Sequence, residues 1–437
     1  MDLPKVLIIG QTFNKKSGGG ITQSNLFYGW DKNKIAVACT AHLLRDSENE
    51  ICSNYYQLGE KEQRWIFPFN FLQRKFYSGV LKFEENSISD NLIAKKPTIR
   101  SKIVDNLFFP FIKYCGLFHS FSKITLSPAF CKWLRDFNPD VIYAQAQDRE
   151  RILFIILVQS YLKKPLIFHM MDDWPSTITD SGLYKKYWYK KIDHDFRMLM
   201  DKATILMSIS DEMADEYKIR YNKNFITFHN PVNIDFWKQH QKVDYKLGSS
   251  PEILYAGRIG LGIDSSLETI AKVIQSINVN LKMSIKFILQ TAEKPEWSNR
   301  YSCVVHNSFV PYSELPKIFA EADFLILPYD FSRKSIKYIK YSMPTKATEY
   351  MASGTPIIVI APEETAIAKY AKKYELAKVI TNNEINNIAE EIRHLIENEE
   401  LRKRIAQNAA KLVEKNHGSI EVTRRFREII QIIANDN

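Results

Sequence analysis

Residues 341–359 contain a cation and a carboxylate three positions apart, Lys346 and Glu349. Pro344 suits the first turn of a helix, where a missing N–H breaks no helical hydrogen bond, and Gly354 suits the left-handed position that ends a helix. Residues three apart share a helix face, so the two charges point together. A cation near a helix N-terminus favours a diphosphate, and a carboxylate one turn further on can accept hydrogen bonds from a ribose diol. The same pair could also form only a surface salt bridge.

A second cation lies in the sequence YAGRIGLGID, directly after an apolar run. Arg258 stands there between Gly257 and Gly260. An arginine at a turn bounded by glycines offers a planar fork of N–H donors to a phosphate group. The alternative is a solvated loop arginine, but the flanking glycines favour a ligand.

A glycine-rich turn follows the first apolar run, in the sequence QTFNKKSGGGITQSNLF. Gly19 and Gly20 let backbone N–H groups approach a phosphate closely, and a helix N-terminus adds a favourable dipole. The spacing is neither GxGxxG nor a Walker loop, which would need a lysine where Ile21 stands. A simple tight turn is the competing interpretation.

The sequence FHMMDDWP gathers a histidine, two carboxylates and a tryptophan. His169, Asp172 and Asp173 follow or end a predicted strand, where a carboxylate could act as a general base or orient a sugar hydroxyl. Either aspartate could also merely cap the next helix. The number of polar groups exceeds what a cap requires, so we expect a functional role.

The hydrophobic pattern supplies two sets of elements that bring these residues to sheet edges. Apolar runs alternating with helical patterns predict strands at 5–10, 34–40, 140–145, 165–170, 203–210 and 226–230. After a turn-rich stretch, the alternation resumes at 252–260, 283–291, 303–310, 322–330, 356–361 and 377–381, followed by a helical tail over 385–433. This alternation predicts an α/β fold of two doubly wound parallel sheets with a cleft between them. Ligands of such sheets bind outside the carboxyl ends of the strands.

The composition fits a soluble protein of two domains. The 437 residues are 45% hydrophobic and 25% charged, and no apolar run is as long as a membrane span. The start, MDLPKVLIIG, lacks the features of a signal peptide, so we expect a cytoplasmic protein. Five scattered cysteines without CxxC spacing argue against disulfides and a zinc site.

Residues 61–125 carry part of the net charge of +10, with 11 lysines and arginines against 5 acidic residues. Aromatic clusters such as FPFNFLQRKFYSG are interleaved with these basic residues. That mixture suits a membrane surface, and a helical insertion packed on a core is the alternative. Nucleic acid is not expected as a partner, because the sequence contains no binding-motif signature.

Taken in order, these motifs resemble those of GT-B glycosyltransferases, most closely family 4. The resemblance runs nearly end to end, through SGGGITQSNLF, FHMMDDW, FHNPVNIDFW, YAGRIG and PTKATEYMASGTPIIV. It implies an acceptor-binding domain at 1–236 with an insertion at about 61–125. It also implies a nucleotide-sugar-binding domain at 237–417 and a C-terminal helix at 418–437 that crosses back to the first domain.

The resemblance also implies roles for individual residues. Glu349 matches the second acid of the family's E-x7-E motif, which holds the donor ribose, and Arg258 matches the arginine on the diphosphate. His169 and Asp172 lie where the family places residues near the transferred sugar. Together with the residue patterns above, this gives the predicted donor-site residues Gly19, Gly20, Ser210, Asn230, Gly257, Arg258, Ser342, Pro344, Lys346 and Glu349.

Two departures from the family pattern bear on the mechanism. The first acid of E-x7-E would fall on Tyr341, and the usual lysine after the arginine would fall on Ile263. Lys346 could replace the missing cation. A lysine at this position also resembles inverting glucuronosyltransferases, so two mechanisms stay open. A retaining enzyme would use the donor diphosphate to assist attack, whereas an inverting one would use Asp172 or Asp173 as base.

We therefore expect a glycosyltransferase that moves a sugar from a UDP- or GDP-sugar to an acceptor hydroxyl, with catalysis assigned to His169, Asp172, Asp173, Arg258 and Lys346. No DxD-type pair follows a strand of the donor domain, so no essential metal is expected. The acceptor is expected to be a glycan or a lipid-linked precursor of capsule, lipopolysaccharide or another surface glycan. The enzyme would be cytoplasmic, peripheral on the inner face of the plasma membrane. The alternatives are a sugar-nucleotide 2-epimerase and a non-catalytic, membrane-bound GT-B scaffold.

Overall fold

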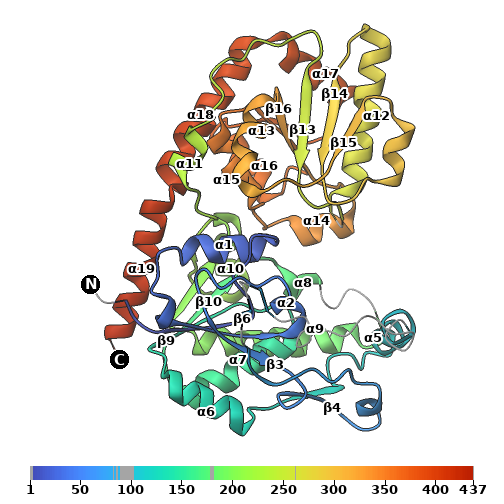
Figure 1. The fold of residues 1–437 in the computed structure, drawn as a ribbon. Helices are drawn as coiled ribbons and strands as arrows, with labels where there is room; N and C mark the ends of the chain where they lie inside the picture. The colour runs from blue at the N-terminus through green and yellow to red at the C-terminus, as the bar shows by residue number, and fades with distance from the viewer. Residues whose placement is uncertain are drawn as a thin grey trace. The chain divides into compact units, whose positions relative to one another are not determined.

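We describe the chain with a computed structural model that describes residues 3–81, 83–84, 87–88, 103–177, 182–260 and 262–436. The chain forms two compact units, shown in Figure 1. Unit 1 comprises Met1–Phe228 together with Thr423–Asn437, and unit 2 comprises His229–Val422. The chain thus leaves unit 1 after Phe228 and returns at Thr423, whereas the sequence places these boundaries at 236 and 417.

Unit 1 is built on an eight-stranded sheet whose strand order is β12-β11-β10-β9-β1-β2-β3-β5. Every neighbouring pair is parallel except β3 and β5, which are antiparallel. The central strands are buried, which explains their near-continuous apolar sequences. The strands are β1 (Val6–Ile9), β2 (Ile35–Thr40), β3 (Asn54–Leu58), β5 (Gly79–Leu81), β9 (Val141–Ala144), β10 (Leu166–Met170), β11 (Ile205–Ser208) and β12 (Ile226–Thr227).

The helices of unit 1 follow the carboxyl ends of these strands, and side chains fix where several begin. Ser17, Ser127, Asp148 and Ser210 each accept a hydrogen bond from a backbone N–H in the first turn. The polar residues after the strands therefore partly serve to start helices. The helices are α1 (Gly18–Leu26), α2 (Ala41–Leu44), α6 (Pro128–Phe137), α7 (Arg149–Leu162), α8 (Trp174–Thr177), α9 (Lys185–Lys202) and α10 (Asp211–Tyr221).

Within residues 61–125, the predicted insertion, a second small sheet pairs β4 (Gln63–Trp65) with β8 (Ser122–Ile124) in antiparallel register. Between them lie η2 (Phe69–Phe71), β6 (Phe83–Glu84), β7 (Ser87–Ile88), the π-helical turn η3 (Val104–Phe108) and α5 (Phe109–Tyr114). Residues 82, 85–86 and 89–102 of the predicted insertion lie outside the described residues.

Unit 2 is built on a six-stranded parallel sheet of order β15-β14-β13-β16-β17-β18. All six strands coincide with predicted apolar runs, and the central strands β13, β16 and β17 are almost wholly buried, which requires apolar residues throughout. The strands are β13 (Glu252–Ala256), β14 (Lys286–Gln290), β15 (Val304–Asn307), β16 (Phe324–Pro328), β17 (Ile357–Ile360) and β18 (Lys378–Ile380).

Helices cover both faces of this sheet. Figure 1 shows α12 (Asp264–Leu281) and α15 (Lys346–Ser353) on opposite sides of the strands. On the first side α12 packs on α17 (Ile385–Glu397), and on the second α15 packs on α18 (Glu399–His417). The other helices are α11 (Ile234–Lys238), α13 (Leu315–Glu321), α14 (Arg333–Ile339) and α16 (Ala366–Lys373).

The last helix, α19 (Ser419–Asn435), begins in unit 2 and belongs to unit 1 from Thr423 onward. Phe426 is fully buried, and its ring lies 5.1 Å from that of Phe27, 5.4 Å from that of Phe228 and 5.8 Å from that of Tyr143. The helical tail predicted over 385–433 is confirmed, and its last helix supplies part of the core of unit 1.

Candidate functional site

In unit 2, Gly257 and Arg258 leave the carboxyl end of β13 in a turn that only glycine fits well. Gly257 has a φ of +144°, and a Cβ atom there would clash with the ammonium group of Lys346. Its N–H donates to the carbonyl of Gln290 over 3.0 Å. The side chain of Arg258 is exposed, and its carbonyl accepts a hydrogen bond of 2.5 Å from the Tyr255 hydroxyl. The turn therefore places Arg258 beside Lys346 and holds the backbone in place.

Lys346, the first residue of α15, points back toward the end of β13. Its Nζ donates to the carbonyl of Ala256 over 2.7 Å and lies 4.1 Å from the centre of the Tyr255 ring. Burial lowers the pKa of Lys346 to about 7, and Arg258 acts in the same direction, whereas Glu349 opposes the shift. A bound diphosphate would favour the charged ammonium.

Glu349 lies one turn further along α15 and is buried, with 7% of its surface exposed. Burial raises the pKa of its carboxyl to about 7, against the opposing effects of Tyr312 and Lys346. The Tyr312 hydroxyl donates to Glu349 Oε1 over 3.0 Å, and the Tyr312 ring stacks on Phe236 at 5.5 Å. Sequence reasoning missed Tyr312. Its position after the predicted strand β15 could have indicated it, because this places Tyr312 at the same edge of the sheet as the other site residues.

The start of α15 is held by residues that the sequence analysis assigned to the donor. The Asn230 side-chain amide donates to the Thr345 carbonyl at 3.2 Å and to the Thr348 hydroxyl at 3.3 Å. Pro344 precedes the N-cap, Thr345, and its carbonyl accepts from the Ala347 N–H at 2.9 Å. Among the described residues, the Thr345 side chain makes no capping bond, so the first N–H groups of α15 have no side-chain cap.

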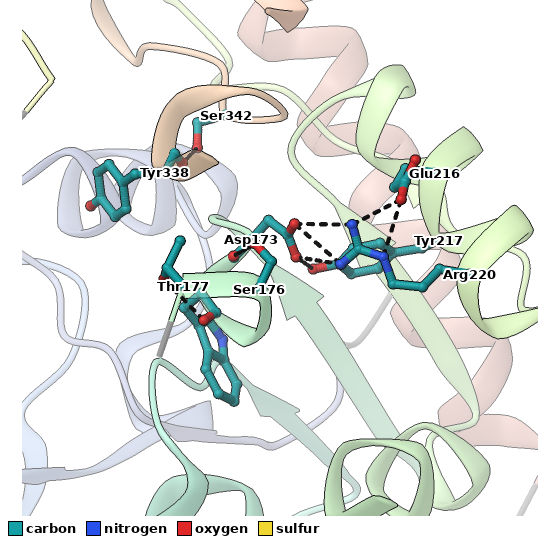
Figure 2. Close-up of polar contacts among 9 residues, drawn as sticks. Asp173, Ser176, Thr177, Glu216, Tyr217, Arg220, Tyr338 and Ser342 are labelled. Atoms are coloured by element: carbon teal, nitrogen blue, oxygen red, sulfur yellow. Dashed lines mark hydrogen bonds and ion pairs between the residues drawn. The ribbon is translucent and has the colours of Figure 1, made fainter. Parts of the chain in front are cut away.

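Ser342 lies in the loop between α14 and α15. Its hydroxyl donates to the Tyr338 carbonyl at 3.5 Å, and its N–H donates to the Ile339 carbonyl at 3.0 Å, as the end of α14 passes into the loop (Figure 2). Tyr341, where the family pattern has an acid, is buried, and the Lys340 ammonium lies 5.0 Å from its ring centre.

In unit 1, Gly19 and Gly20 stand in the first turn of α1, packed against polar side chains of the preceding loop. A Cβ on Gly19 would clash with the Gln11 amide, and one on Gly20 would clash with Asn14. Ser17 caps the helix at Gly20 N–H over 3.2 Å. The glycines are therefore needed for close packing at this helix start, whose N-terminus carries partial positive charge.

The two neighbouring aspartates have different surroundings. The buried Asp173 carboxylate forms a two-pronged ion pair with Arg220, with contacts of 2.9, 3.1 and 3.2 Å, and accepts a hydrogen bond of 2.7 Å from Tyr217 (Figure 2). Arg220 also pairs with Glu216 at 2.9 Å. Asp173 therefore fastens the loop after β10 to α10, while Asp172 is partly exposed in the same loop.

His169 and Ser210 have structural surroundings. His169 is fully buried in β10, its Nδ1 lies 2.7 Å from the Tyr143 hydroxyl, and burial lowers its pKa to about 3. The imidazole is therefore neutral at physiological pH. Ser210 is the N-cap of α10 and accepts from the Met213 N–H at 3.1 Å. Of the residues predicted in unit 1 for catalysis, Asp172 alone is partly exposed.

A pocket also opens in unit 1 at the carboxyl ends of β1, β2 and β3. Its polar lining includes Glu62, Glu150 and Arg151. Burial raises the pKa of Glu150. Glu62 is fully buried and accepts hydrogen bonds from Tyr56 and Ser127. These hydrogen bonds show that Glu62 helps to hold the loops at this edge of the sheet together.

Within the part of the chain that the structure describes, no three His, Cys, Asp or Glu side chains gather closely enough to hold a metal ion. Among the described helices, none combines the length and apolar character that crossing a membrane requires.

Comparisons with known proteins agree with this geometry. The sequence model of the family described as "Glycosyl transferases group 1" matches residues 238–412. A search of curated proteins finds no match. The fold resembles that of sucrose-phosphate synthase from Thermosynechococcus elongatus, with a TM-score of 0.63, 11% identity and 99% of each chain covered.

Two further solved structures are similar over nearly the whole chain. Anabaena HepE in complex with UDP and glucose gives a TM-score of 0.59 at 12% identity, covering 98% of this chain and 99% of that one. WaaG, a glycosyltransferase involved in lipopolysaccharide biosynthesis, also gives 0.59 at 12% identity, covering 97% and 99%. These likenesses confirm the predicted GT-B fold with its two Rossmann-like units.

Proposed function

We infer the donor and the acceptor of this chain from the premise that it is a GT-B glycosyltransferase, with a glycosyl transferases group 1 domain at residues 238–412. The proposed reaction transfers a sugar from a UDP-sugar to the hydroxyl group of a glycan or a lipid-linked precursor. The complex of HepE with UDP and glucose supports uridine diphosphate as the donor nucleotide.

One observation carries the donor assignment. Lys346, Arg258 and the start of α15 gather positive charge at the carboxyl end of β13, and Glu349 lies one turn deeper. This arrangement suits a diphosphate followed by a ribose, because the cations face the phosphate charge and the carboxylate can accept from both ribose hydroxyls. Tyr312 would hold the Glu349 carboxylate in the required orientation.

The proposed chemistry is stabilisation of the leaving group. Cleavage of the bond between the anomeric carbon and the diphosphate oxygen puts negative charge on the diphosphate. The Lys346 ammonium, the Arg258 guanidinium and the backbone N–H groups of α15 would stabilise that charge. Lys346 would thereby supply the cation that family members carry at the position of Ile263.

We favour retention of the anomeric configuration, in which the diphosphate assists attack by the acceptor hydroxyl on the same face. The ion pair of Asp173 with Arg220 and the burial of His169 make both poor general bases. An inverting mechanism is the alternative, and Asp172 would then be its base. Analysis of the anomeric configuration of the product by NMR distinguishes the two mechanisms.

For the acceptor, we propose a surface-glycan precursor, bound in unit 1 and presented at the inner face of the plasma membrane. The likeness to WaaG, described as involved in lipopolysaccharide biosynthesis, supports this class of acceptor. No essential metal is proposed, so EDTA should leave the activity unchanged.

The test measures UDP-sugar binding by calorimetry and donor hydrolysis by release of UDP. Lys346→Ala should weaken UDP binding about tenfold to a hundredfold, since a charge-assisted contact to the diphosphate contributes about 1.5–3 kcal/mol. Glu349→Gln should weaken binding of UDP more than binding of pyrophosphate, because only UDP has a ribose.

Lys317→Ala is the matched control, since Lys317 is an exposed lysine of the same unit in a surface ion pair. Unchanged UDP affinity in Lys346→Ala would refute the donor assignment. Conversion of the donor sugar to its epimer without any acceptor would identify a 2-epimerase instead. Tight UDP binding without transfer to any glycan or lipid-linked acceptor would favour a non-catalytic scaffold.

A further inference from the structure

We propose that unit 1 carries a docking surface for anionic lipid bilayers, formed by the helical segment 103–114 together with the first turn of α9. The inference extends the proposed function, which needs a membrane only for a lipid-linked acceptor. Lipid binding is measured separately from donor binding, so failure of the membrane proposal can be distinguished from failure of the proposed function. The start of α9 lies outside the segment 61–125 that the sequence indicates as a membrane surface.

The helical segment exposes an apolar stripe. Ile103, Leu107, Phe111 and Tyr114 are spaced four, four and three residues apart, so they share one helix face. Their exposed fractions are 55%, 71%, 62% and 62%. Contiguous apolar side chains on the surface of a folded protein mark an interaction site, because water is an unfavourable neighbour.

A neighbouring face of the same segment is packed against unit 1. Ile112 is buried, with 1% of its surface exposed, and Phe108 joins an aromatic cluster with Trp65, Phe69 and Phe121. Ring centres in this cluster lie 4.8 Å apart for Trp65 and Phe121 and 5.6 Å apart for Phe69 and Phe108. The apolar stripe therefore faces solvent, while the packing of Phe108 and Ile112 holds the helix on unit 1.

The start of α9 extends this surface. The Leu183 N–H donates to the carbonyl of Tyr114 over 2.9 Å, and the indole N–H of Trp188 donates to the carbonyl of Gly116. Leu183, Tyr184 and Tyr187 are 63%, 58% and 59% exposed. These two hydrogen bonds place the exposed apolar residues before and at the start of α9 next to the end of the helical segment 103–114.

The lysines beside this surface favour an anionic bilayer as its partner. Residues 182–192 contain four lysines and no acidic residue, and Lys185, Lys186 and Lys190 are exposed. Lysines beside exposed aromatic and aliphatic side chains suit anionic headgroups above an acyl layer. A second copy of this chain would bring the same lysines against this surface, so self-association is disfavoured.

The test is sedimentation of the full-length protein with vesicles. Vesicles of equal parts phosphatidylglycerol and phosphatidylcholine should bind the protein at least tenfold more tightly than pure phosphatidylcholine, and added salt should weaken the binding. Leu107→Ser with Phe111→Ser, and separately Lys185→Glu with Lys186→Glu, should each reduce the partition at least tenfold. UDP affinity, measured without vesicles, should stay unchanged in both variants.

Matched controls are Ile432→Ser, at an exposed apolar residue of α19, and Lys403→Glu with Arg404→Glu, at exposed cations of α18. Both should bind vesicles within twofold of the unaltered protein. Equal binding to the two vesicle types, or unchanged binding in both docking-surface variants, would overturn the proposal. A dimer of the unaltered protein that Leu107→Ser with Phe111→Ser converts to a monomer would assign the surface to self-association instead.

Hydrogen exchange of the unaltered protein gives a readout that does not depend on variants. Anionic vesicles should slow exchange in residues 103–117 and 183–190 by at least threefold, because these amides would lie at the lipid surface. Protection confined to other parts of the chain would contradict the proposed surface, whatever the variants do.

Discussion

At the scale of residues, Lys346 and Glu349 are linked titrating groups. Burial lowers the pKa of the lysine and raises that of the glutamate, so that both lie at about 7. Each group also favours the charged form of the other. A bound nucleotide would shift the two pKa values in opposite directions. The diphosphate favours the ammonium form of Lys346 and so raises its pKa, whereas the ribose hydroxyls favour the carboxylate form of Glu349 and so lower its pKa.

UDP binding should therefore be coupled to protons in opposite directions at the two residues. At pH 7.5, Glu349→Gln should show net proton uptake, because only Lys346 remains and its pKa rises on binding. At pH 6.5, Lys346→Met should show net proton release, because the pKa of Glu349 falls on binding. Calorimetry in buffers of different ionisation enthalpy measures both signs, and proton uptake by Lys346→Met would contradict this account.

Sequence spacing predicted part of the geometry of α15 but not the contacts that hold its side chains. The spacing of Lys346 and Glu349 on one helix predicted their shared face. The contact of Tyr312 with Glu349 depends on a loop 37 positions earlier in the chain, which local periodicity does not encode. Roles of Asn230 and Ser210 in helix starts were also hidden, since a polar residue after a strand can cap a helix or contact a ligand.

At the scale of elements, Asp173 and Arg220 connect the loop after β10 to α10. Asp173 is 2% exposed, and its carboxylate accepts from both Arg220 and Tyr217. A carboxylate this buried depends on its partners, because an unpaired buried charge is strongly unfavourable. The neighbouring Asp172 has a different environment, although the sequence makes the two residues look equivalent.

Asp173→Asn and Asp172→Asn should therefore have different effects. Loss of the charge at Asp173 leaves Arg220 without its main partner and should lower the free energy of unfolding of unit 1 by about 3–5 kcal/mol. Asp172→Asn should change that free energy by less than about 1 kcal/mol. Urea unfolding followed by far-UV circular dichroism measures both, and equal destabilisation would contradict the assignment.

Two of the strands that sequence reasoning missed lie at one edge of the unit 1 sheet. The strands β3 and β5 were not predicted, although β3 pairs with β2 over five residues. The sequence of β3, NYYQL, is short and carries two polar residues, so it lacks the apolar run that marked the central strands. The antiparallel β5 has three residues and gives no periodic signal at all.

At the scale of the whole molecule, the core of unit 1 contains a segment that follows unit 2 in the chain. Phe426 of α19 packs against Phe27, Tyr143 and Phe228, which come from three other parts of unit 1. Sequence periodicity predicted the helix but not its partners. Only the resemblance to GT-B enzymes implied that a C-terminal helix returns to the first domain.

Phe426→Ala should destabilise unit 1 by about 3–5 kcal/mol, because truncation of a fully buried aromatic side chain leaves a cavity. Hydrogen exchange should rise in β9 and α1 while exchange in β13 and β14 stays within the error of the unaltered protein. Ile432→Ala is the control, since this residue of the same helix is 58% exposed. A similar loss of protection in both units would show that they unfold together.

The return of α19 to unit 1 also sets an order of events on the ribosome. Translation proceeds from the N-terminus, so residues 229–422 are complete before residues 423–437 exist. The first domain to begin synthesis is therefore the last to receive all of its core. Until Phe426 is made, Phe27, Tyr143 and Phe228 lack this aromatic neighbour, so the core of unit 1 can close only after synthesis has passed through all of unit 2.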